Sequence, residues 1–182
     1  PAILGNINRD DFVHELMLYQ IEYNPPPIPL AGCPFSVLRK YLAASINVIT
    51  QAATQVAPTV QPALIGILPT LRAQDLSPRN ITPKPRYRQL NRALEVAYGH
   101  LHDIQIGQLD LPHQTLAFQG ANTSFQMHLA VRPTDYAATY NAAQLAAGVA
   151  LAGCGNSPSL LGHKLWHETR IPRCSPGEKR RQ

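Results

Sequence analysis

The stretch TSFQMHLAV, residues 123–131, alternates polar and apolar side chains. Successive side chains on a β-strand point to opposite faces, so the alternation predicts a strand. One face would carry Gln126 and His128, and the other Phe125 and Met127. A polar face of this kind is either the solvent side of a sheet or the wall of a binding site, and the stretch alone does not decide between them.

The composition is that of a single globular domain. The chain has 182 residues, 45% of them hydrophobic, which is enough for a core. It contains no run of 18 apolar residues and does not begin with a signal-peptide pattern, so we expect a soluble, cytoplasmic protein with no membrane partner. The three cysteines, Cys33, Cys154 and Cys174, have no ligand-type spacing, which fits a reducing compartment.

The positive charge is concentrated at the end of the chain. The net charge is +5, and residues 173–182, RCSPGEKRRQ, carry much of it. A basic segment of this kind is usually solvated and disordered, although it can bind polyanions. No basic stripe interleaved with aromatic residues occurs elsewhere, so nucleic acid is not an expected partner.

The periodicity of apolar residues predicts alternating helices and strands. Helices are expected at 8–17, 36–57, 85–98, 133–152 and 156–167. Besides 123–131, strands are expected at 18–24, 63–68, 100–107 and 115–119. The Pro-rich stretch 69–85 predicts a long ordered loop. This order of elements indicates an α+β fold with a largely antiparallel sheet.

A carboxylate stands in the middle of the strand expected at 18–24. Glu22 shares one face of that strand with Gln20 and Asn24, and Glu15 precedes it by seven residues. A carboxylate on the inner face of a sheet is costly to desolvate unless it meets a cation, and Mg²⁺ prefers oxygen ligands. Glu22 is therefore a candidate metal ligand, while a solvent-exposed face explains the pattern equally well.

Two arginines are candidates for binding phosphate or carboxylate. Arg86 stands at the start of the helix expected at 85–98, and Arg170 follows Glu168 by two residues. Guanidinium groups bind both anions through paired hydrogen bonds, but a single arginine is more often the partner in a surface ion pair. The chain has no phosphate-loop, dinucleotide-binding, zinc-protease or serine-hydrolase motif.

Six segments taken in order point to a known family. They are HELMLYQIEYNPPP (14–27), ALIGILPTL (63–71), TPKPRYRQLNRAL (82–94), GANTSFQMHLAV (120–131), YNAAQLAAGVALAGCGNSP (140–158) and LWHETRIP (165–172). Together they resemble the carboxylate-amine ligases that include bacterial glutamate-cysteine ligases. The resemblance implies a glutamine synthetase-like fold, in which a curved antiparallel sheet packed with helices forms a funnel. It also implies an ATP-dependent reaction that joins the γ-carboxylate of glutamate to the amine of cysteine through an acyl phosphate.

The resemblance extends to the metal site. Members of the family bind Mg²⁺, and the matching positions here are Glu15, Glu22, His128 and Glu168. On this basis we expect Glu22, Gln126 and His128 to converge around a single cation.

The resemblance also assigns nucleotide and substrate contacts. Gln126, His128 and Arg170 match positions that contact ATP, which is a substrate of the family. Arg170 matches the ETR element, which implies a role in binding metal or phosphate, and Arg86 is expected near a substrate carboxylate or phosphate. These two arginines are the catalytic candidates. Phosphoryl transfer depends on charge neutralisation and alignment, which acids holding Mg²⁺ and arginines supply.

Two departures from the family pattern bear on activity. No acid-x-acid pair precedes Glu15, and the similarity ends at Pro172. We therefore expect an incomplete ligase domain over 1–172 and a basic disordered tail over 173–182, with impaired activity. The sequence leaves open a ligase with another amine acceptor and a non-catalytic remnant, and it gives no oligomeric state.

Overall fold

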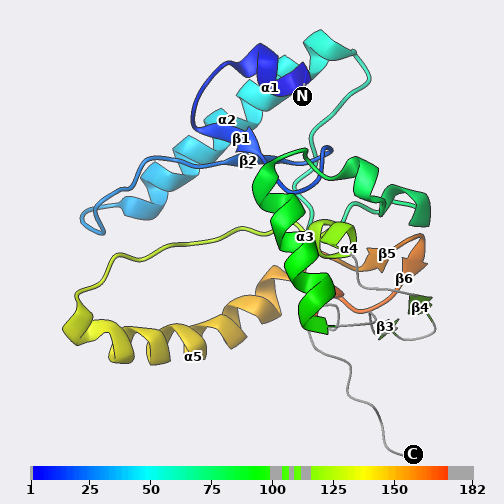
Figure 1. The fold of residues 1–182 in the computed structure, drawn as a ribbon. Helices are drawn as coiled ribbons and strands as arrows, with labels where there is room; N and C mark the ends of the chain where they lie inside the picture. Colours follow the sequence, from blue (N-terminus) through cyan, green and yellow to red (C-terminus); the bar gives the residue numbers. More distant parts are fainter. Residues whose placement is uncertain (1, 99–103, 107–108, 112–115, 172–182) are drawn as a thin grey trace, which may run out of the picture.

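The computed structural model describes residues 2–98, 104–106, 109–111 and 116–171 (Figure 1). The helices are α1 (Ala2–Ile7), α2 (Pro34–Val56), α3 (Pro85–Tyr98), α4 (Leu116–Gly120) and α5 (Tyr136–Cys154). The strands are β1 (Phe12–His14), β2 (Ile21–Tyr23), β3 (Ile104–Ile106), β4 (Leu109–Leu111), β5 (Ser159–Leu160) and β6 (His163–Lys164). Short 3-10 turns lie at Ala73–Asp75, Pro78–Asn80 and Pro133–Asp135. This mixture of helices and strands confirms the α+β class.

The strands form three separate antiparallel pairs. β1 pairs with β2, β3 with β4, and β5 with β6. The antiparallel pairing is as predicted, but within the described ranges the pairs are not joined into one curved sheet. A glutamine synthetase-like sheet is therefore not confirmed.

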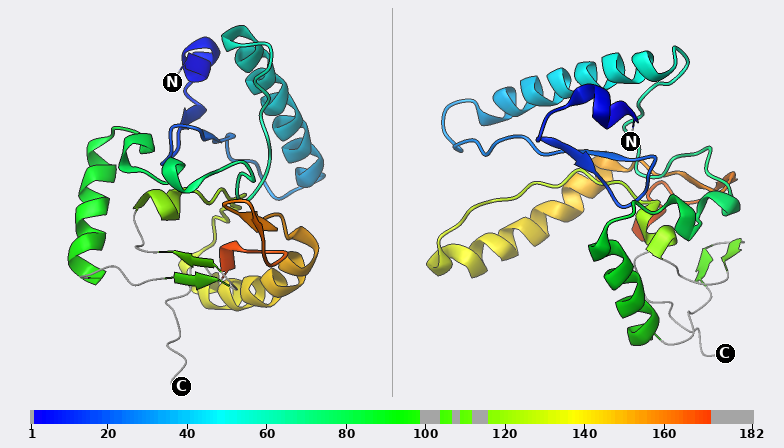
Figure 2. Two further views of the ribbon diagram at one scale, coloured as in Figure 1. Left: turned by 90° about the vertical axis from the view of Figure 1, so that its right-hand side faces the viewer. Right: turned by 45° about the horizontal axis from the view of Figure 1, so that its top comes forward.

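The first hydrophobic cluster joins the N-terminal elements. Phe12 of β1 packs on Tyr23 of β2 with ring centroids 4.8 Å apart. Ile7 of α1 and Ala52 of α2 are buried with Phe12, and the side-chain amide of Asn6 donates to the Ala52 carbonyl at 3.3 Å. α1 therefore lies beside the C-terminal end of α2 (Figure 2).

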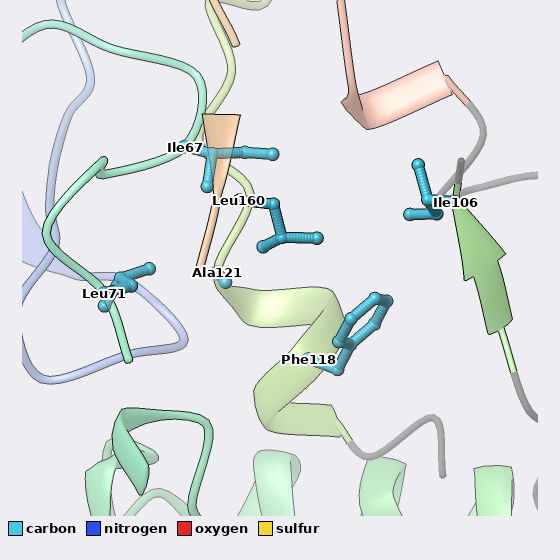
Figure 3. Packing of buried hydrophobic residues seen from close by; sticks show 6 residues of the cluster. All are labelled: Ile67, Leu71, Ile106, Phe118, Ala121 and Leu160. Atoms are coloured by element: carbon cyan, nitrogen blue, oxygen red, sulfur yellow. The ribbon is translucent and has the colours of Figure 1, made fainter. Parts of the chain in front are cut away.

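The second hydrophobic cluster draws together segments that are far apart in sequence (Figure 3). Its buried members come from the stretch after residue 63, from β3, from α4 and its end, and from β5: Ile67, Leu71, Ile106, Phe118, Ala121 and Leu160. Gln20, just before β2, is only 7% exposed. Its amide nitrogen donates to the Gly120 carbonyl at 2.7 Å, so the start of β2 is tied to the end of α4.

The helix predicted at 8–17 is wrong. α1 ends at Ile7, Asn8 has a left-handed φ of 47°, and Phe12–His14 pairs with Ile21–Tyr23 as β1 and β2. The capping signal at Asn8 is outweighed because an extended backbone places the Phe12 ring against Tyr23.

Two further elements have the opposite type from the prediction. The strand expected at 115–119 is helix α4, whose apolar residues at 116–118 are all buried. The helix expected at 156–167 is the hairpin β5–β6. Leu161 and Gly162 connect its strands with φ values of 51° and 81°, and two positive φ angles suit a two-residue hairpin turn.

The strands expected at 63–68 and 123–131 do not form. The first makes only an isolated bridge between Ile67 and Asn122. The second is extended, but its side chains from 124 onward are exposed and it pairs with no described strand (Figure 1). A strand needs a neighbour with which it forms a continuous series of backbone hydrogen bonds. With distant segments the 63–68 stretch forms only isolated ones, at Gly66, and the described residues show none from 124 to 131.

The remaining elements agree with the sequence. Helices predicted at 36–57, 85–98 and 133–152 are confirmed as α2, α3 and the turn at 133–135 followed by α5. The strand at 18–24 is confirmed in its centre as β2, and the loop at 69–85 holds only two 3-10 turns. The strand at 100–107 is confirmed where it is described, at β3. The tail at 173–182, with Cys174, lies outside the described residues.

Candidate active site

Two carboxylates meet beside the β1–β2 pair. Glu22 stands opposite Val13 in the register, and alternation puts it on the other face from Tyr23, which packs with the helices. Glu15 follows β1 directly. Burial raises the pKa of Glu22 above its usual value, and a side-chain hydrogen bond and the charge of Glu15 raise it further. These two predicted metal ligands are therefore neighbours.

The Pro-rich loop brings an arginine to the same place. The Thr82 amide donates to the Leu16 carbonyl at 2.8 Å, and the Thr82 hydroxyl donates to the Glu15 carbonyl at 2.6 Å. Three residues later α3 begins at Pro85, whose fixed φ suits the first helical position. Arg86, in the first turn, is thereby placed close to the acidic pair.

Arg86 lies within electrostatic range of both acids. The pKa of Arg86 is raised chiefly by a hydrogen bond to the Tyr87 hydroxyl, and the charges of Glu15 and Glu22 add to this effect. In return, the charge of Arg86 partly offsets the raised pKa of Glu22. The structure thus brings together three of the residues predicted from sequence.

Sequence reasoning missed the residue that holds Arg86. Nη2 of Arg86 donates to the Tyr87 hydroxyl at 2.6 Å, and the guanidinium lies 4.6 Å from the centre of the Tyr87 ring. Tyr87 is only 7% exposed, so the ring is a fixed support. No sequence signal identified Tyr87, since adjacent residues on a helix do not normally face each other.

Glu168 and Arg170 form a second, separate cluster. Nε and Nη2 of Arg170 donate to the two carboxylate oxygens of Glu168, each at 2.6 Å. The Ser157 hydroxyl also donates to Glu168, and the Asn156 amide donates at 3.3 Å. The hydrogen bonds from Arg170 are the largest cause that lowers the pKa of Glu168 to about 2; burial opposes them, and Ser157 and Asn156 assist.

This second cluster fixes the start of the 123–131 segment. Nη1 of Arg170 donates to the Thr123 carbonyl at 2.6 Å. The Thr123 amide donates to the Gly66 carbonyl at 2.8 Å, and the Gly66 amide donates to the Asn156 carbonyl at 2.9 Å. Both Glu168 oxygens accept protein hydrogen bonds. A metal-binding role for Glu168 and a catalytic role for Arg170 stay predictions.

Gln126 and His128 do not join the acidic pair. Both side chains are exposed on the 123–131 segment. Across the described ranges, no three His, Cys, Asp or Glu side chains lie together where they could hold a metal ion, so His128 does not complete a set with Glu15 and Glu22. The expected convergence of Glu22, Gln126 and His128 is therefore wrong, because 123–131 is not incorporated into a sheet beside β2. Their contacts with ATP stay predictions.

Comparison with known protein families gives a match over nearly the whole chain. Residues 2–181 match the glutamate-cysteine ligase family 2 (GCS2). The chain belongs to this family, and membership supports a ligase that joins a carboxylate to an amine and acts on small molecules. Neither the curated proteins nor the solved structures gave a match. Among the helices described, none has both the length and the apolar character of a membrane span.

Proposed function

We propose that Glu15, Glu22 and Arg86 form the active site of an ATP-dependent carboxylate-amine ligase. The observation that carries this proposal is the meeting of two acids and one arginine from chain segments more than 60 residues apart, within a chain of the GCS2 family. In the proposed reaction the γ-carboxylate of glutamate takes the terminal phosphoryl group of ATP and becomes an acyl phosphate. The amine of cysteine then displaces phosphate, so the products are the amide, ADP and phosphate.

The acidic pair fits a hard divalent cation. Two carboxylates in contact repel each other, and burial raises the pKa of Glu22. A cation between them would relieve both effects. Mg²⁺ is usually held by one or two carboxylates and keeps water and phosphate oxygens as its other ligands. Glu15 and Glu22 would hold it, and when bound it would neutralise and align the phosphates of ATP.

Arg86 supplies a fixed positive charge at this site. Its guanidinium stays protonated at neutral pH and offers several N–H donors to a phosphate or carboxylate. The Tyr87 hydroxyl and ring hold the guanidinium in place, so less side-chain entropy is lost when an anion binds. We assign Arg86 to the orientation of the acyl phosphate or of the substrate carboxylate.

The Glu168–Arg170 cluster has a positioning role in this proposal. Through the Thr123 carbonyl it fixes the point from which residues 123–131 extend, and that segment carries Gln126 and His128, the proposed nucleotide contacts. The glutamine synthetase-like fold remains a prediction from the family resemblance.

A thermal-shift titration with ATP and Mg²⁺ tests the site. We expect ATP with Mg²⁺ to raise the melting temperature, and this increase to be lost in Glu22→Gln and reduced in Arg86→Lys. Glu95→Gln is the matched control, since Glu95 is exposed on α3. An increase that survives in Glu22→Gln, or that is lost equally in the control, would contradict the proposal.

The acceptor is tested separately. ADP release is measured with ATP, glutamate and a panel of amines. Release that depends on cysteine supports the glutamate-cysteine reaction, and release with a different amine assigns another acceptor. Stabilisation by ATP with Mg²⁺ and no turnover with any amine would favour a non-catalytic nucleotide-binding remnant.

A further inference from the structure

Residues 123–154 form an arm that is apolar and exposed along its length. In Figure 1 the segment 123–131 runs outward from α4, and α5 runs back beneath it toward the rest of the molecule. No residue of α5 is buried. Nine large apolar side chains of the arm are 38% to 80% exposed: Phe125, Met127, Leu129, Val131, Tyr136, Tyr140, Leu145, Val149 and Leu151.

The helix of this arm has the composition of a buried helix. α5 contains no charged residue, and apolar and small side chains surround it on all sides. Leu145 and Val149, one turn apart, are 80% and 79% exposed. A helix that is apolar all round is normally buried in a protein core or another apolar environment. α5 therefore lacks a covering surface among the described residues.

The extended part of the arm also lacks backbone hydrogen-bond partners among the described residues. From 124 to 131 no backbone amide or carbonyl hydrogen-bonds to another described residue, in contrast to Thr123, which is bonded to Gly66. Extended backbone with free donors and acceptors is a template for pairing with another strand. The alternation of apolar and polar side chains along 123–131 is already that of a strand with one buried face.

The charges of the arm favour a second copy as the partner. Its only charged side chains are Arg132 and Asp135, which pair with each other at 2.7 Å. A strongly charged partner would bury charged side chains at the interface, and the arm offers no unpaired opposite charges to pair with them. An identical arm is equally neutral, and a two-fold axis lets the same patch meet itself.

The available area is sufficient for such a dimer. If a large apolar side chain has a full area of about 200 Å², the exposed fractions of the nine residues correspond to on the order of 1,000 Å² on each copy. A stable protein interface of standard size buries about 800 Å² on each partner.

We propose that the arm, residues 123–154, docks against the arm of a second copy of this chain. In the dimer, 123–131 pairs antiparallel with its symmetry mate, and the two α5 helices cover one another. This inference does not depend on the proposed ligase function.

Sedimentation of the full chain between about 1 and about 100 µM tests the proposal, since self-association depends on concentration. We expect a monomer–dimer equilibrium, and slower hydrogen exchange at residues 124–131 as the dimer forms. Val149→Glu should weaken dimerisation by at least about tenfold, because the two-fold axis buries the new charge twice. Leu129→Lys should do the same through the strand.

Val96→Glu is the matched control, because Val96 is 84% exposed on α3, outside the arm. It should leave the dimer unchanged. Several outcomes would overturn the proposal: a monomer at all concentrations, polydisperse aggregates in place of a dimer, equal weakening by Val96→Glu, or binding to neutral lipid vesicles without self-association. The assay contains no nucleotide, so a failure here is separate from a failure of the ligase proposal.

Discussion

Replacing Glu168 by glutamine is predicted to destabilise the fold strongly. The Glu168 side chain is 9% exposed, and its pKa is about 2 instead of 4.5, chiefly because Arg170 donates two hydrogen bonds to it. One pKa unit corresponds to about 1.4 kcal/mol, so this lowering contributes roughly 3.5 kcal/mol to stability at neutral pH. The partner, Arg170, is 24% exposed, and solvent screening reduces the expected loss to about 2 to 3 kcal/mol.

The dependence on pH distinguishes this pair from a simple loss of packing. The pKa of Glu168 is lower in the folded than in the unfolded state, so its stabilisation is complete above pH 4.5 and is lost as pH falls toward 2. The free energy of unfolding is measured by urea titration at several pH values from neutral to about 2.5. Glu168→Gln should be less stable than the wild type at neutral pH, and the two proteins should converge at low pH.

Glu95→Gln is the control, since Glu95 lies exposed on α3. It should change the free energy of unfolding by no more than about 0.5 kcal/mol, as is usual at exposed sites. The reasoning would be refuted if Glu168→Gln matched the wild type at neutral pH, or if the difference between them stayed constant down to pH 2.5.

Two further predictions concern packing and the acidic pair. In Gly66→Ala the new Cβ would lie 2.8 Å from the Arg170 guanidinium, so we expect a loss of about 1 to 3 kcal/mol in urea unfolding. Gly148→Ala, in α5 with nothing within 4 Å, should instead stabilise by about 0.5 to 1 kcal/mol, and the opposite order would be inconsistent with the Gly66 contact. In Glu15→Gln the pKa of Glu22 should fall, because Glu15 helps to raise it. An acid whose pKa is raised in the folded state makes the protein less stable as pH rises through its unfolded-state pKa. Because Glu15→Gln lowers the pKa of Glu22, this variant should also be more stable than the wild type at neutral pH. NMR titration of the Glu22 carboxyl checks the pKa, and an unchanged value would show that the two acids are not in contact.

The long helices could be predicted because their signals are local. Pro85 at the first position and Gly99 after the end define α3, and Pro133 precedes α5 in the same way. The elements at 116–120 and 159–164 could not be predicted, since their type depends on contacts with distant segments. α4 is helical because Phe118 and Ala121 pack on the second hydrophobic cluster, and no local pattern encodes that contact.

The members of the candidate site could be predicted from the sequence, but their arrangement in space could not. Glu15, Glu22 and Arg86 were identified from sequence, but their meeting depends on the Thr82 hydrogen bond to the Glu15 carbonyl. For Arg170 the sequence left two roles open, binding of phosphate or carboxylate and an ion pair. The observed contact with Glu168 is an ion pair. With side chains only 24% and 9% exposed, Arg170 and Glu168 are more buried than a surface ion pair. The Ser157 hydroxyl donates a further hydrogen bond to Glu168.

Titration of the full chain with Mg²⁺, followed by the side-chain carboxyl ¹³C resonances, tests the central claim most directly. The account predicts that the resonances of Glu15 and Glu22 shift together with a single affinity, and that Glu15→Gln abolishes the shift of Glu22. The resonance of the exposed Glu95 should not move. Resonances of Glu15 and Glu22 that stay constant, or that change with different affinities, would contradict a shared metal site at the acidic pair.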